Sequence, residues 1–591
     1  MTNNVLSLFL EKVEKYKNKP WLFSKIHNDN KGYWQGITWR EVAQRVNFLA
    51  RYLEQMNLGP EPKIIILSEN RPEWIISLYA IWAMGGVPVP IMPGTAPDNI
   101  NFIMQNAEAK VAIISNKNLF SQAEGAYMQK YIKHLIGFSG DVAQHVAKNS
   151  KFHYFSQIIH GTQRMHSTAQ GDKVSLNERA SSILPDAVSV ILYTSGTSGR
   201  PRGVMLTHRA QLAVVDSLMP LFNRIPKFKY GKESFLSFLP LSHCYELHVI
   251  SVIAMNLGAR VYFAESLEKL SQNMAEVKPS IITAVPRLYQ AMRGKILTRL
   301  EQQKKLSKFL LNSTITLGMK KANRQPMGLG EKLGNFFLNF LVRRKIRKTF
   351  GGRLKAFISG GAPLAPDVGA FIAALGVRVL QGYGLTEASI AASVNLPFDE
   401  RMDSVGVPIK GLEVKIAEDG EILLKGPTLM KGYWKDPEAT KNNFNQEGYL
   451  KTGDIGKIDN GHLVITERKK DIIVNSGGEN IAPQRIENIL QLEPEIKQAM
   501  VYGDKKPYLI ALLVAEEAEE NHNLKKISQE QKLKTAIDRA NKKLANFEKI
   551  KKFAIAKEEF SVNNKMLSPT LKLRRHVVLE KYKSTISNLY R

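Results

Sequence analysis

Short runs of β-branched and other apolar residues alternate with helical patterns over the N-terminal part of this chain. The runs begin at Lys63, Ala109, Ser189, Ser234, Ala259, Ser280, Leu354 and Val377. Alternation of this kind predicts an α/β architecture with largely parallel sheets. Ligands of such sheets bind at the carboxyl ends of the strands, and several of these runs end in Gly, Ser or Pro.

The pattern changes after about Val405. Alternating strands from Leu412 and from Asp454 surround Asp-Gly and Asn-Gly pairs, which indicates hairpins. Beyond the charged stretch ERKKD, Glu467–Asp471, helices resume. A chain of 591 residues exceeds what one hydrophobic core organises, so we expect a large domain over residues 1–469 and a small one over residues 470–591.

One uncharged segment, Trp74–Met92, has about the length of a membrane span. Gly85-Gly86 and Pro88 would break a helix there, so we predict a buried helix, a turn and a short strand. The N-terminus predicts an amphipathic helix and no secretory signal. A single cysteine, Cys244, cannot form an internal disulfide, which is typical of the cytoplasm.

The net charge of +29 is concentrated in two stretches. Residues 293–353 contain sixteen Lys and Arg against two acidic residues, and residues 541–591 contain thirteen against four. The first stretch interleaves bases with apolar residues, which is typical of a segment on an anionic membrane surface. A solvated helix face is the alternative. No zinc spacing or RNA-recognition signature indicates a nucleic-acid partner.

The stretch YTSGTSGRPRGVMLTH, Tyr193–His208, follows a predicted strand directly. Its glycines let backbone N–H groups converge on an anion, its hydroxyls add donors, and Arg200 and Arg202 add charge. These features indicate a polyphosphate cradle, although neither the Walker nor the dinucleotide pattern is present. A Ser/Thr/Gly-rich surface loop without a ligand is the alternative.

Further motifs follow in a fixed order: SGGAPL from Ser359, QGYGLTE from Gln381, KTGD from Lys451, ERKKDIIVNSGGENIAPQRIE from Glu467 and LSPTLKLRR from Leu567. With the loop, they resemble the motifs of the adenylate-forming acyl-CoA synthetase superfamily over essentially the whole chain. FLPLSHCYE from Phe238, AVPRLYQAM from Ala284 and the SPTLKLRR ending are similar to the long-chain fatty acid–CoA ligases.

The resemblance implies a large domain of two α/β sheets with a small β-barrel-like subdomain at about residues 405–469, and a mobile α+β C-terminal domain. It implies ATP, Mg²⁺ and coenzyme A. A fatty carboxylate attacks the α-phosphorus of ATP to give an acyl-adenylate and pyrophosphate, and the thiol of coenzyme A then displaces AMP. The chief demand is neutralisation of charge between two anions.

The resemblance also implies the residues that bind nucleotide. Adenine stacks on Tyr383, Asp454 accepts from both ribose hydroxyls, and Arg468 supports the same sugar. Arg202 stands where the family usually has lysine, so a planar fork replaces a compact ammonium. The full set is Thr194, Ser195, Gly196, Thr197, Ser198, Gly199, Arg202, Gly360, Gly361, Ala362, Gln381, Gly382, Tyr383, Gly384, Asp454 and Arg468.

Four residues are implied to act in catalysis. Lys572 bridges the carboxylate and the α-phosphate, and Thr386 bonds the α-phosphate. Glu387 coordinates Mg²⁺ with Thr194 nearby. His243 is a wall of the acyl or α-phosphate pocket; we expect it on a strand, with the adjacent Cys244 facing the other way and packing inside.

The small domain is implied to turn between the two steps. Lys470 occupies the hinge position, and Gly477 the position where the pantetheine arm of coenzyme A enters. Leu571 stands where the family usually has glycine before the catalytic lysine, which predicts a stiffer loop.

The sequence leaves other functions open. An acyl–acyl carrier protein synthetase would suit the basic patches, and a fatty acyl-AMP ligase would have the same fold. A basic membrane-binding or nucleic-acid-binding protein without catalysis is the alternative of another class, but Glu387 and Asp454 are intact. We expect a cytoplasmic enzyme, peripheral at the inner face of a membrane, with a fatty acid and coenzyme A as substrates.

Overall fold

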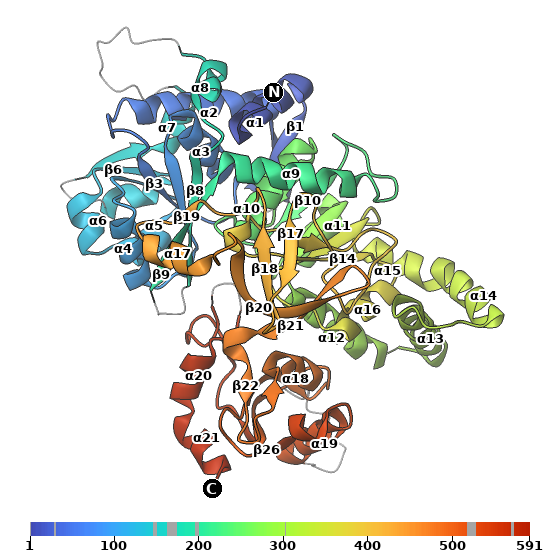
Figure 1. The fold of residues 1–591 in the computed structure, drawn as a ribbon. Coiled ribbons are helices and arrows are strands. Elements are labelled where there is room, and N and C mark those ends of the chain that lie inside the picture. The colour runs from blue at the N-terminus through green and yellow to red at the C-terminus, as the bar shows by residue number, and fades with distance from the viewer. Residues whose placement is uncertain are drawn as a thin grey trace.

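The computed structural model describes residues 2–28, 31–145, 150–161, 174–195, 200–301, 303–516, 528–568 and 572–591. A large α/β body fills the upper part of Figure 1, and a smaller C-terminal unit lies below it. Two sheets of mainly parallel strands form the body, which confirms the predicted α/β class.

The first sheet has five parallel strands in the order β4-β3-β5-β6-β7. Its interior strand β3 is buried from Ile64 to Leu67, as expected where helices cover both faces. The elements of this region are β3 (Lys63–Leu67), β4 (Val87–Ile91), β5 (Val111–Ile114), β6 (His134–Gly137), β7 (Lys151–Tyr154), α2 (Trp39–Glu54), α3 (Pro72–Ala83), α4 (Pro97–Asn106), α5 (Lys117–Ala123), α6 (Ala126–Tyr131) and α7 (Phe155–Ile159).

The second sheet has nine strands in the order β16-β15-β14-β13-β12-β10-β11-β1-β2. The strands from β1 to β14 in this order are parallel, and the outer pairs are antiparallel. Its strands are β1 (Pro20–Asn28), β2 (Lys31–Thr38), β10 (Ser234–Ser237), β11 (Arg260–Phe263), β12 (Ile281–Ala284), β13 (Ala356–Ser359), β14 (Val379–Tyr383), β15 (Ser393–Val394) and β16 (Val407–Pro408). The helices between β10 and β14 include α10 (Cys244–His248), the π-helical η2 (Val249–Ala254), α11 (Leu270–Val277) and α16 (Pro366–Ala374). Earlier in the chain, α8 (Leu176–Ser182) and α9 (His208–Phe222) precede β10.

The uncharged segment Trp74–Met92 lies in α3, a turn and β4, as predicted. Every residue of α3 from Trp74 to Ala83 is buried, so the apolar character of this helix serves the core. Among the described residues, no helix combines the length and the apolar character needed to cross a bilayer.

The N-terminal helix α1 (Val5–Tyr16) is amphipathic, as predicted, and buries its apolar face in the main core. Phe9 stacks on Tyr79 of α3 with ring centroids 4.5 Å apart, and Trp21 stacks on Trp39 at 3.9 Å. Offset aromatic pairs of this kind add to the free energy of burial, so α1 fastens the two sheets to each other.

Two smaller sheets complete the body. The loop predicted to cradle phosphate connects β8 (Val188–Ser195) to β9 (Pro201–Thr207), which join β19 (Gly432–Tyr433) in the order β19-β9-β8. The region predicted to be barrel-like is a four-stranded antiparallel sheet in the order β17-β18-β20-β21. Its hairpins turn at Asp419-Gly420 and Asn460-Gly461, as predicted; its elements are β17 (Glu413–Ile416), β18 (Glu421–Lys425), α17 (Pro437–Asn443), β20 (Leu450–Asp459) and β21 (His462–Arg468).

The C-terminal unit has hydrophobic clusters built from residues beyond Ile473. A short η5 (Lys469–Asp471) leads into it from β21. Its elements are β22 (Ile473–Val474), β23 (Asn480–Ile481), α18 (Pro483–Leu490), β24 (Ile496–Tyr502), β25 (Leu509–Ala515), α19 (Gln529–Asn541), β26 (Ile550–Ile555), α20 (Arg575–Lys581) and α21 (Lys583–Leu589). The mixture of sheet and helices agrees with the predicted α+β character.

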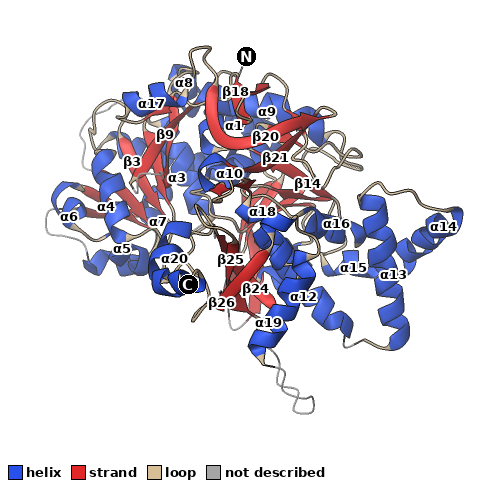
Figure 2. Cartoon of the chain, turned by 60° about the horizontal axis from the view of Figure 1, so that its bottom comes forward, coloured by secondary structure: helices blue, strands red, loops and turns tan. Residues whose placement is uncertain are grey.

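A helical arm, residues 305–349, projects from one side of the body in both views (Figures 1 and 2). It contains most of the basic stretch predicted at residues 293–353. Its elements are α13 (Lys305–Ala322), α14 (Leu329–Leu338), the π-helical η3 (Asn339–Arg343) and α15 (Arg344–Thr349), and α12 (Pro286–Glu301) precedes it.

Candidate active site

One cavity of about 4070 Å³ lies between the body and the C-terminal unit. The strands β12, β13 and β14 point their carboxyl ends at it, as expected for a parallel sheet. Most of the predicted site residues line this single cavity: Thr194, Arg202, His243, Gly360, Gly361, Ala362, Gln381, Gly382, Tyr383, Gly384, Thr386, Glu387, Asp454, Arg468, Lys470 and Lys572.

The predicted phosphate loop is the turn of the β8–β9 hairpin. Thr194 pairs with Arg202 across this hairpin, so a hydroxyl and a guanidinium lie on opposite sides of the loop. The residues Gly196, Thr197, Ser198 and Gly199 lie outside the described residues, and of Ser195 only the backbone is described.

Arg202 has two partners that the sequence analysis did not find. Its Nε lies 3.6 Å from Oδ2 of Asp436, and its guanidinium lies over the ring of Tyr433 at 5.7 Å. The hydroxyl of Tyr433 donates to Glu387 Oε1 at 3.0 Å. Tyr433 therefore links the cation beside the phosphate loop to the predicted metal-binding carboxylate.

A second group joins β14 to the β20–β21 hairpin. The hydroxyl of Tyr383 donates to Oδ2 of Asp454 at 2.7 Å, and Nε of Arg468 lies 3.1 Å from Oδ1 of the same carboxylate. Burial, and then the Asp454 charge, raise the pKa of Tyr383 well above its ordinary value, so its hydroxyl stays a donor. These contacts hold the Tyr383 side chain at the cavity wall.

Two glycines allow the wall to close tightly. A Cβ on Gly384 would lie 1.6 Å from the carbonyl oxygen of Ile390, so the backbone turn after Tyr383 excludes any side chain. A Cβ on Gly360 would meet the ring of Tyr245 at 3.1 Å, and the Tyr245 hydroxyl donates to the carbonyl of Ile358 at 2.8 Å.

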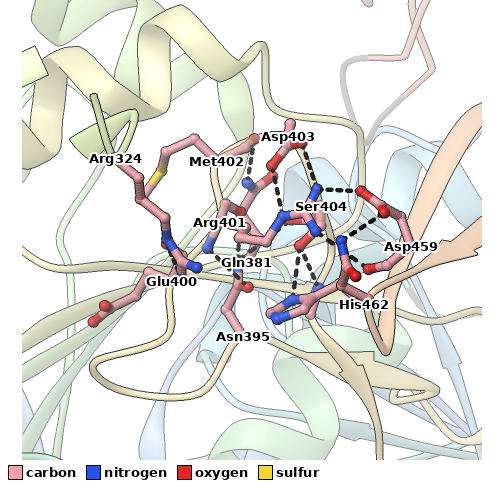
Figure 3. A network of polar contacts seen from close by, with 12 residues as sticks. Arg324, Gln381, Asn395, Glu400, Arg401, Met402, Asp403, Ser404, Asp459 and His462 are labelled. Atoms are coloured by element: carbon pink, nitrogen blue, oxygen red, sulfur yellow. Dashed lines mark hydrogen bonds and ion pairs between the residues drawn. The ribbon is translucent and has the colours of Figure 1, made fainter. Parts of the chain in front are cut away.

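The polar network drawn in Figure 3 contacts β14 through the side chain of Gln381. Nε2 of Gln381 donates to the carbonyl of Met402 at 2.9 Å. Beside it, Arg401 forms ion pairs with Asp403 and Asp459, both at 2.7 Å. Gln381 thus fixes the start of the QGYG turn, and its side chain is buried.

The predicted strand position of His243 is wrong. His243 is the N-cap of α10, and its Nδ1 accepts from the backbone N–H of Tyr245 at 3.2 Å. Burial, with the nearby Lys572 charge, lowers the pKa of His243 to about 4, so the imidazole is neutral at pH 7. Cys244 is buried, as predicted, in the first turn of the helix. The motif FLPLSHCYE did not reveal the helix cap, because a short run of this kind fits the end of a strand as well as the start of a helix.

Glu246, also on α10, is a buried carboxyl that the sequence analysis gave no role. It accepts from the hydroxyls of Ser237 at 2.6 Å and Thr283 at 2.7 Å, so it ties α10 to the ends of β10 and β12. Burial raises the pKa of Glu246 to about 7. Its signal in the sequence is a lone acid in an apolar helix, which does not identify the two partners.

Lys572 enters the cavity from the C-terminal unit. It lies close to Ser568: the Ser568 N–H donates to the Lys572 carbonyl at 2.8 Å, and the Lys572 N–H donates to Ser568 Oγ at 3.0 Å. The residue is accessible to solvent, yet loss of hydration in the cavity lowers the pKa of its ammonium to about 8, and Arg468 adds to this effect. The carboxylates of Asp454 and Glu387 act in the opposite direction and raise the pKa of Lys572. Lys572, Arg468, Asp454 and Glu387 therefore lie around the same part of the cavity.

Lys470 and Gly477 have different positions. Lys470 lies in η5, where the chain passes from β21 into the C-terminal unit, and it faces the cavity. Gly477 lies in an exposed turn between β22 and β23 and is absent from the cavity lining. The structure therefore does not bring Gly477 together with the other predicted site residues.

An apolar branch of the cavity runs between α9 and η2. Its lining includes Leu218, Phe222 and Ile225 from the end of α9, and Val249 and Ile253 from the π-helical turn. All five are buried. The sequence directs attention to Leu239–Tyr245 and Val285–Tyr289, which also contribute to the cavity, but gives no sign that α9 supplies a wall.

Family comparisons cover nearly the whole chain. Residues 9–434 match the family described as AMP-binding enzyme, and residues 470–591 match the AMP-binding enzyme C-terminal domain. The long-chain-fatty-acid–CoA ligase FadD15 of Mycobacterium bovis is 30% identical over 577 residues, which span 95% of this chain and 93% of the relative. Long-chain-fatty-acid–CoA ligase 6 of Mus musculus is 30% identical over 594 residues, spanning 94% and 83%.

Solved structures share the fold. The adenylation domain of a carboxylate reductase from Mycobacterium chelonae has a TM-score of 0.78 at 19% identity, covering 99% of this chain and 91% of that one. ATP-bound MatB from Rhodopseudomonas palustris has a TM-score of 0.68 at 21% identity, covering 99% and 100%. The likeness confirms the arrangement of a large N-terminal part and a smaller C-terminal part.

Glu246 makes stability depend on pH. The pKa of Glu246 in the folded protein, about 7, lies above the ordinary 4.5. The protonated carboxyl therefore contributes fully to the free energy of unfolding below pH 4.5, and this contribution is lost as the pH rises through 7. From pH 5 to pH 8, the free energy of unfolding of Glu246→Gln should therefore rise by on the order of 2 kcal/mol relative to that of wild type. Thermal unfolding across this range measures the effect, with the exposed Glu14→Gln as control; parallel curves for Glu246→Gln and wild type would contradict it.

Proposed function

Because the chain belongs to the AMP-binding enzyme family, as its motifs indicate, we propose that it activates a long-chain fatty acid with ATP and transfers the acyl group to coenzyme A. The observation that carries the proposal is the convergence of Thr194, Arg202, Glu387, Asp454 and Lys572 on one cavity from distant parts of the chain. Both curated relatives described above are named long-chain-fatty-acid–CoA ligases.

The nucleotide lies along the cavity wall made by β14 and the β20–β21 hairpin. Adenine stacks on Tyr383, whose hydroxyl is held by Asp454, and the backbone at Gly360, Gly361 and Ala362 closes the opposite side. Asp454 has carboxylate oxygens to share with the ribose, and Arg468 orients that carboxylate.

The phosphates extend toward the β8–β9 hairpin. Thr194 and the loop Ser195–Gly199 receive the β- and γ-phosphates, with Arg202 as the adjacent cation. Because Asp436 and Tyr433 already hold the planar guanidinium in place, arginine can substitute for the usual lysine here. Thr386 bonds the α-phosphate.

The donor set fits Mg²⁺. The described residues contain no cluster of three His, Cys, Asp or Glu side chains, but Mg²⁺ typically takes one or two carboxylates and completes its shell with phosphates and water. Glu387 is oriented by Tyr433 and lies in the same cavity as Thr194, so these two residues would hold the ion. When bound, Mg²⁺ neutralises phosphate charge.

Lys572 supplies the mobile cation of the first step. The carboxylate attacks the α-phosphorus, pyrophosphate leaves, and the ammonium offsets charge on both reactants. In the second step the thiol attacks the acyl carbonyl and AMP leaves. Lys470 is the hinge about which the C-terminal unit turns, which withdraws Lys572 and brings Gly477 to the thiol channel.

Acyl carrier protein is the alternative acceptor, and its acidic surface would suit the basic residues near the C-terminus. The likeness to the named CoA ligases over most of the chain favours coenzyme A. A ligase that stops at the adenylate would lack the second step altogether, so an assay of both steps separates the three enzymes.

Lys572→Ala should lose the first step by at least about 100-fold, because a charge that acts mainly in the transition state is removed. The measurement is pyrophosphate release with ATP and palmitate, beside thioester formation from supplied palmitoyl-adenylate and coenzyme A. The second reaction should stay within about threefold of wild type. An unchanged rate of pyrophosphate release would exclude the assigned role.

Gly477→Leu is the reciprocal variant. A Cβ at Gly477 meets only Asn475 Oδ1 at 3.3 Å and Glu479 Oε2 at 3.5 Å, so the turn tolerates a side chain after small shifts. Adenylate formation should persist while thioester formation with coenzyme A stops. In wild type, thioester formation on acyl carrier protein at a rate equal to that on coenzyme A would favour the alternative enzyme.

The apolar branch between α9 and η2 receives the acyl chain. Its walls are buried side chains on two helices, and a π-helical turn often marks a functional site. Burial of methylene groups there supplies on the order of 0.8 kcal/mol each, so the depth of the branch sets the preferred chain length.

Ile253→Trp should shorten this branch. We expect kcat/KM for palmitate to fall at least about tenfold while kcat/KM for octanoate stays within about twofold, because only the longer chain reaches position 253. Ile253→Ala, which enlarges the branch, should not discriminate against palmitate. Equal losses for both acids in the Trp variant would place the acyl chain elsewhere.

The helical arm, residues 305–349, carries the proposed membrane surface. Its outer stripe consists of apolar residues that are each more than half exposed: Leu329, Leu333, Phe336, Phe337, Phe340 and Leu341. Their helical spacing puts them on one face of α14 and η3. The arm has eleven Lys and Arg against one Glu, so an anionic lipid surface complements both its apolar stripe and its charge.

The arm is fixed firmly to the body. Buried Arg343 donates to the carbonyl of Ala374 on α16 at 2.6 Å, and a Cβ on Gly318 would lie 2.5 Å from Ala374. The same guanidinium donates to the carbonyl of Thr314 within the arm at 3.2 Å. Arg324 donates to Asp399 at 2.6 Å. A rigid base means that the exposed stripe is a standing feature of the fold.

Replacing Phe336, Phe337 and Phe340 together by Ser should reduce binding to vesicles of phosphatidylglycerol and phosphatidylcholine at least about tenfold, since exposed rings are lost without opening the core. Vesicle sedimentation measures this. Wild type should bind neutral vesicles weakly and release anionic ones at high salt. The exposed Leu184→Ser is the matched control; undiminished binding of the triple variant would exclude the arm as the membrane surface.

A further inference from the structure

The helix α18 is gripped at both ends by side chains of the large body. At its start, Oε2 of Glu467 on β21 accepts from the backbone N–H of Gln484 at 3.1 Å. Just beyond its end, Nη1 of Arg293 on α12 donates to the carbonyl of Leu492 at 3.3 Å. α12 and α18 lie beside each other in both ribbon views (Figures 1 and 2).

The signs of these charges match the helix. The first N–H groups of a helix lack intrahelical acceptors and its last carbonyls lack donors, so an anion at the start and a cation at the end are both favourable. Glu467 is buried, which raises its pKa, and burial likewise lowers the pKa of Arg293. Charges with little water around them interact strongly with the backbone N–H and carbonyl groups at the ends of α18.

The same helix anchors the loop of Lys572. Arg575, three residues after the lysine, forms a two-fold contact with Glu487 of α18 at 2.6 and 2.7 Å. Glu487 also accepts from the backbone N–H of Val501 at 2.7 Å and is almost fully buried. Arg575 therefore fixes the segment that follows Lys572 to α18 and β24.

These contacts form a continuous chain from the body to the reacting lysine. We propose that Glu467 and Arg293 are positioning residues for adenylate formation: they orient α18, and through Glu487 and Arg575 they orient Lys572 in the cavity. The inference rests on the proposed two-step function. It assigns to the first step two cavity-lining residues that act through α18, and the second step does not need them because Lys572 has by then withdrawn.

Arg293→Gln and Glu467→Gln test the inference. Each should lower kcat for pyrophosphate release about tenfold or more, because a small misplacement of a charged group is costly, and should leave KM for ATP within about twofold. Thioester formation from supplied palmitoyl-adenylate should not slow. Arg293→Lys, which keeps the cation, should recover part of the first step.

Equal slowing of both steps in the Gln variants would overturn the inference, as would an unaltered first step. Failure of the Lys variant to exceed the Gln variant would also count against it, because loss of packing would then explain the result. Arg224→Gln, at an exposed arginine after α9, is the matched control. Absence of both steps in wild type would instead refute the proposed function, so the two failures are distinguishable.

Discussion

Cationic groups from three separate parts of the chain share one cavity at the carboxyl ends of parallel strands. Arg202 comes from β9, Arg468 and Lys470 from the end of β21 and the following η5, and Lys572 from the segment before α20. Only a fold that brings these elements together can surround a polyphosphate and a carboxylate at once. The parallel sheet supplies the fixed wall, and the two antiparallel hairpins and the C-terminal unit bring the charges to it.

Two of these four cations already have partners on the protein. Arg468 pairs with Asp454, and Arg202 lies between Asp436 and Tyr433. Such pairing keeps each guanidinium in one orientation before a ligand arrives, which lowers the entropy lost on binding. Lys572 differs, because its pKa is lowered to about 8 and loss of hydration dominates the shift. An ammonium that has lost hydration gains most from two approaching anions.

The sequence predicts those features that depend on local chemistry. Alternating runs predict the parallel strands, and Asp419-Gly420 and Asn460-Gly461 predict the hairpins because these pairs accept the required backbone angles. The motifs also identify most of the cavity lining. Tyr433, Glu246 and Arg293 escaped detection because their partners are distant in sequence and their surroundings exist only after folding. His243 was misplaced because a short apolar motif does not separate a strand from a helix cap.

The basic stretch at residues 293–353 shows why residue type alone does not predict where each charge lies in the fold. The basic stretch at residues 293–353 reads as one segment, yet folding divides it: Arg293 on α12 contacts the C-terminal unit, whereas the arm turns its phenylalanines to solvent. The division follows from the break between α12 and α13, after which Gly318 and Arg343 fix the arm against α16. A single continuous helix across this break would place the basic residues of α12 and those of the arm along one axis.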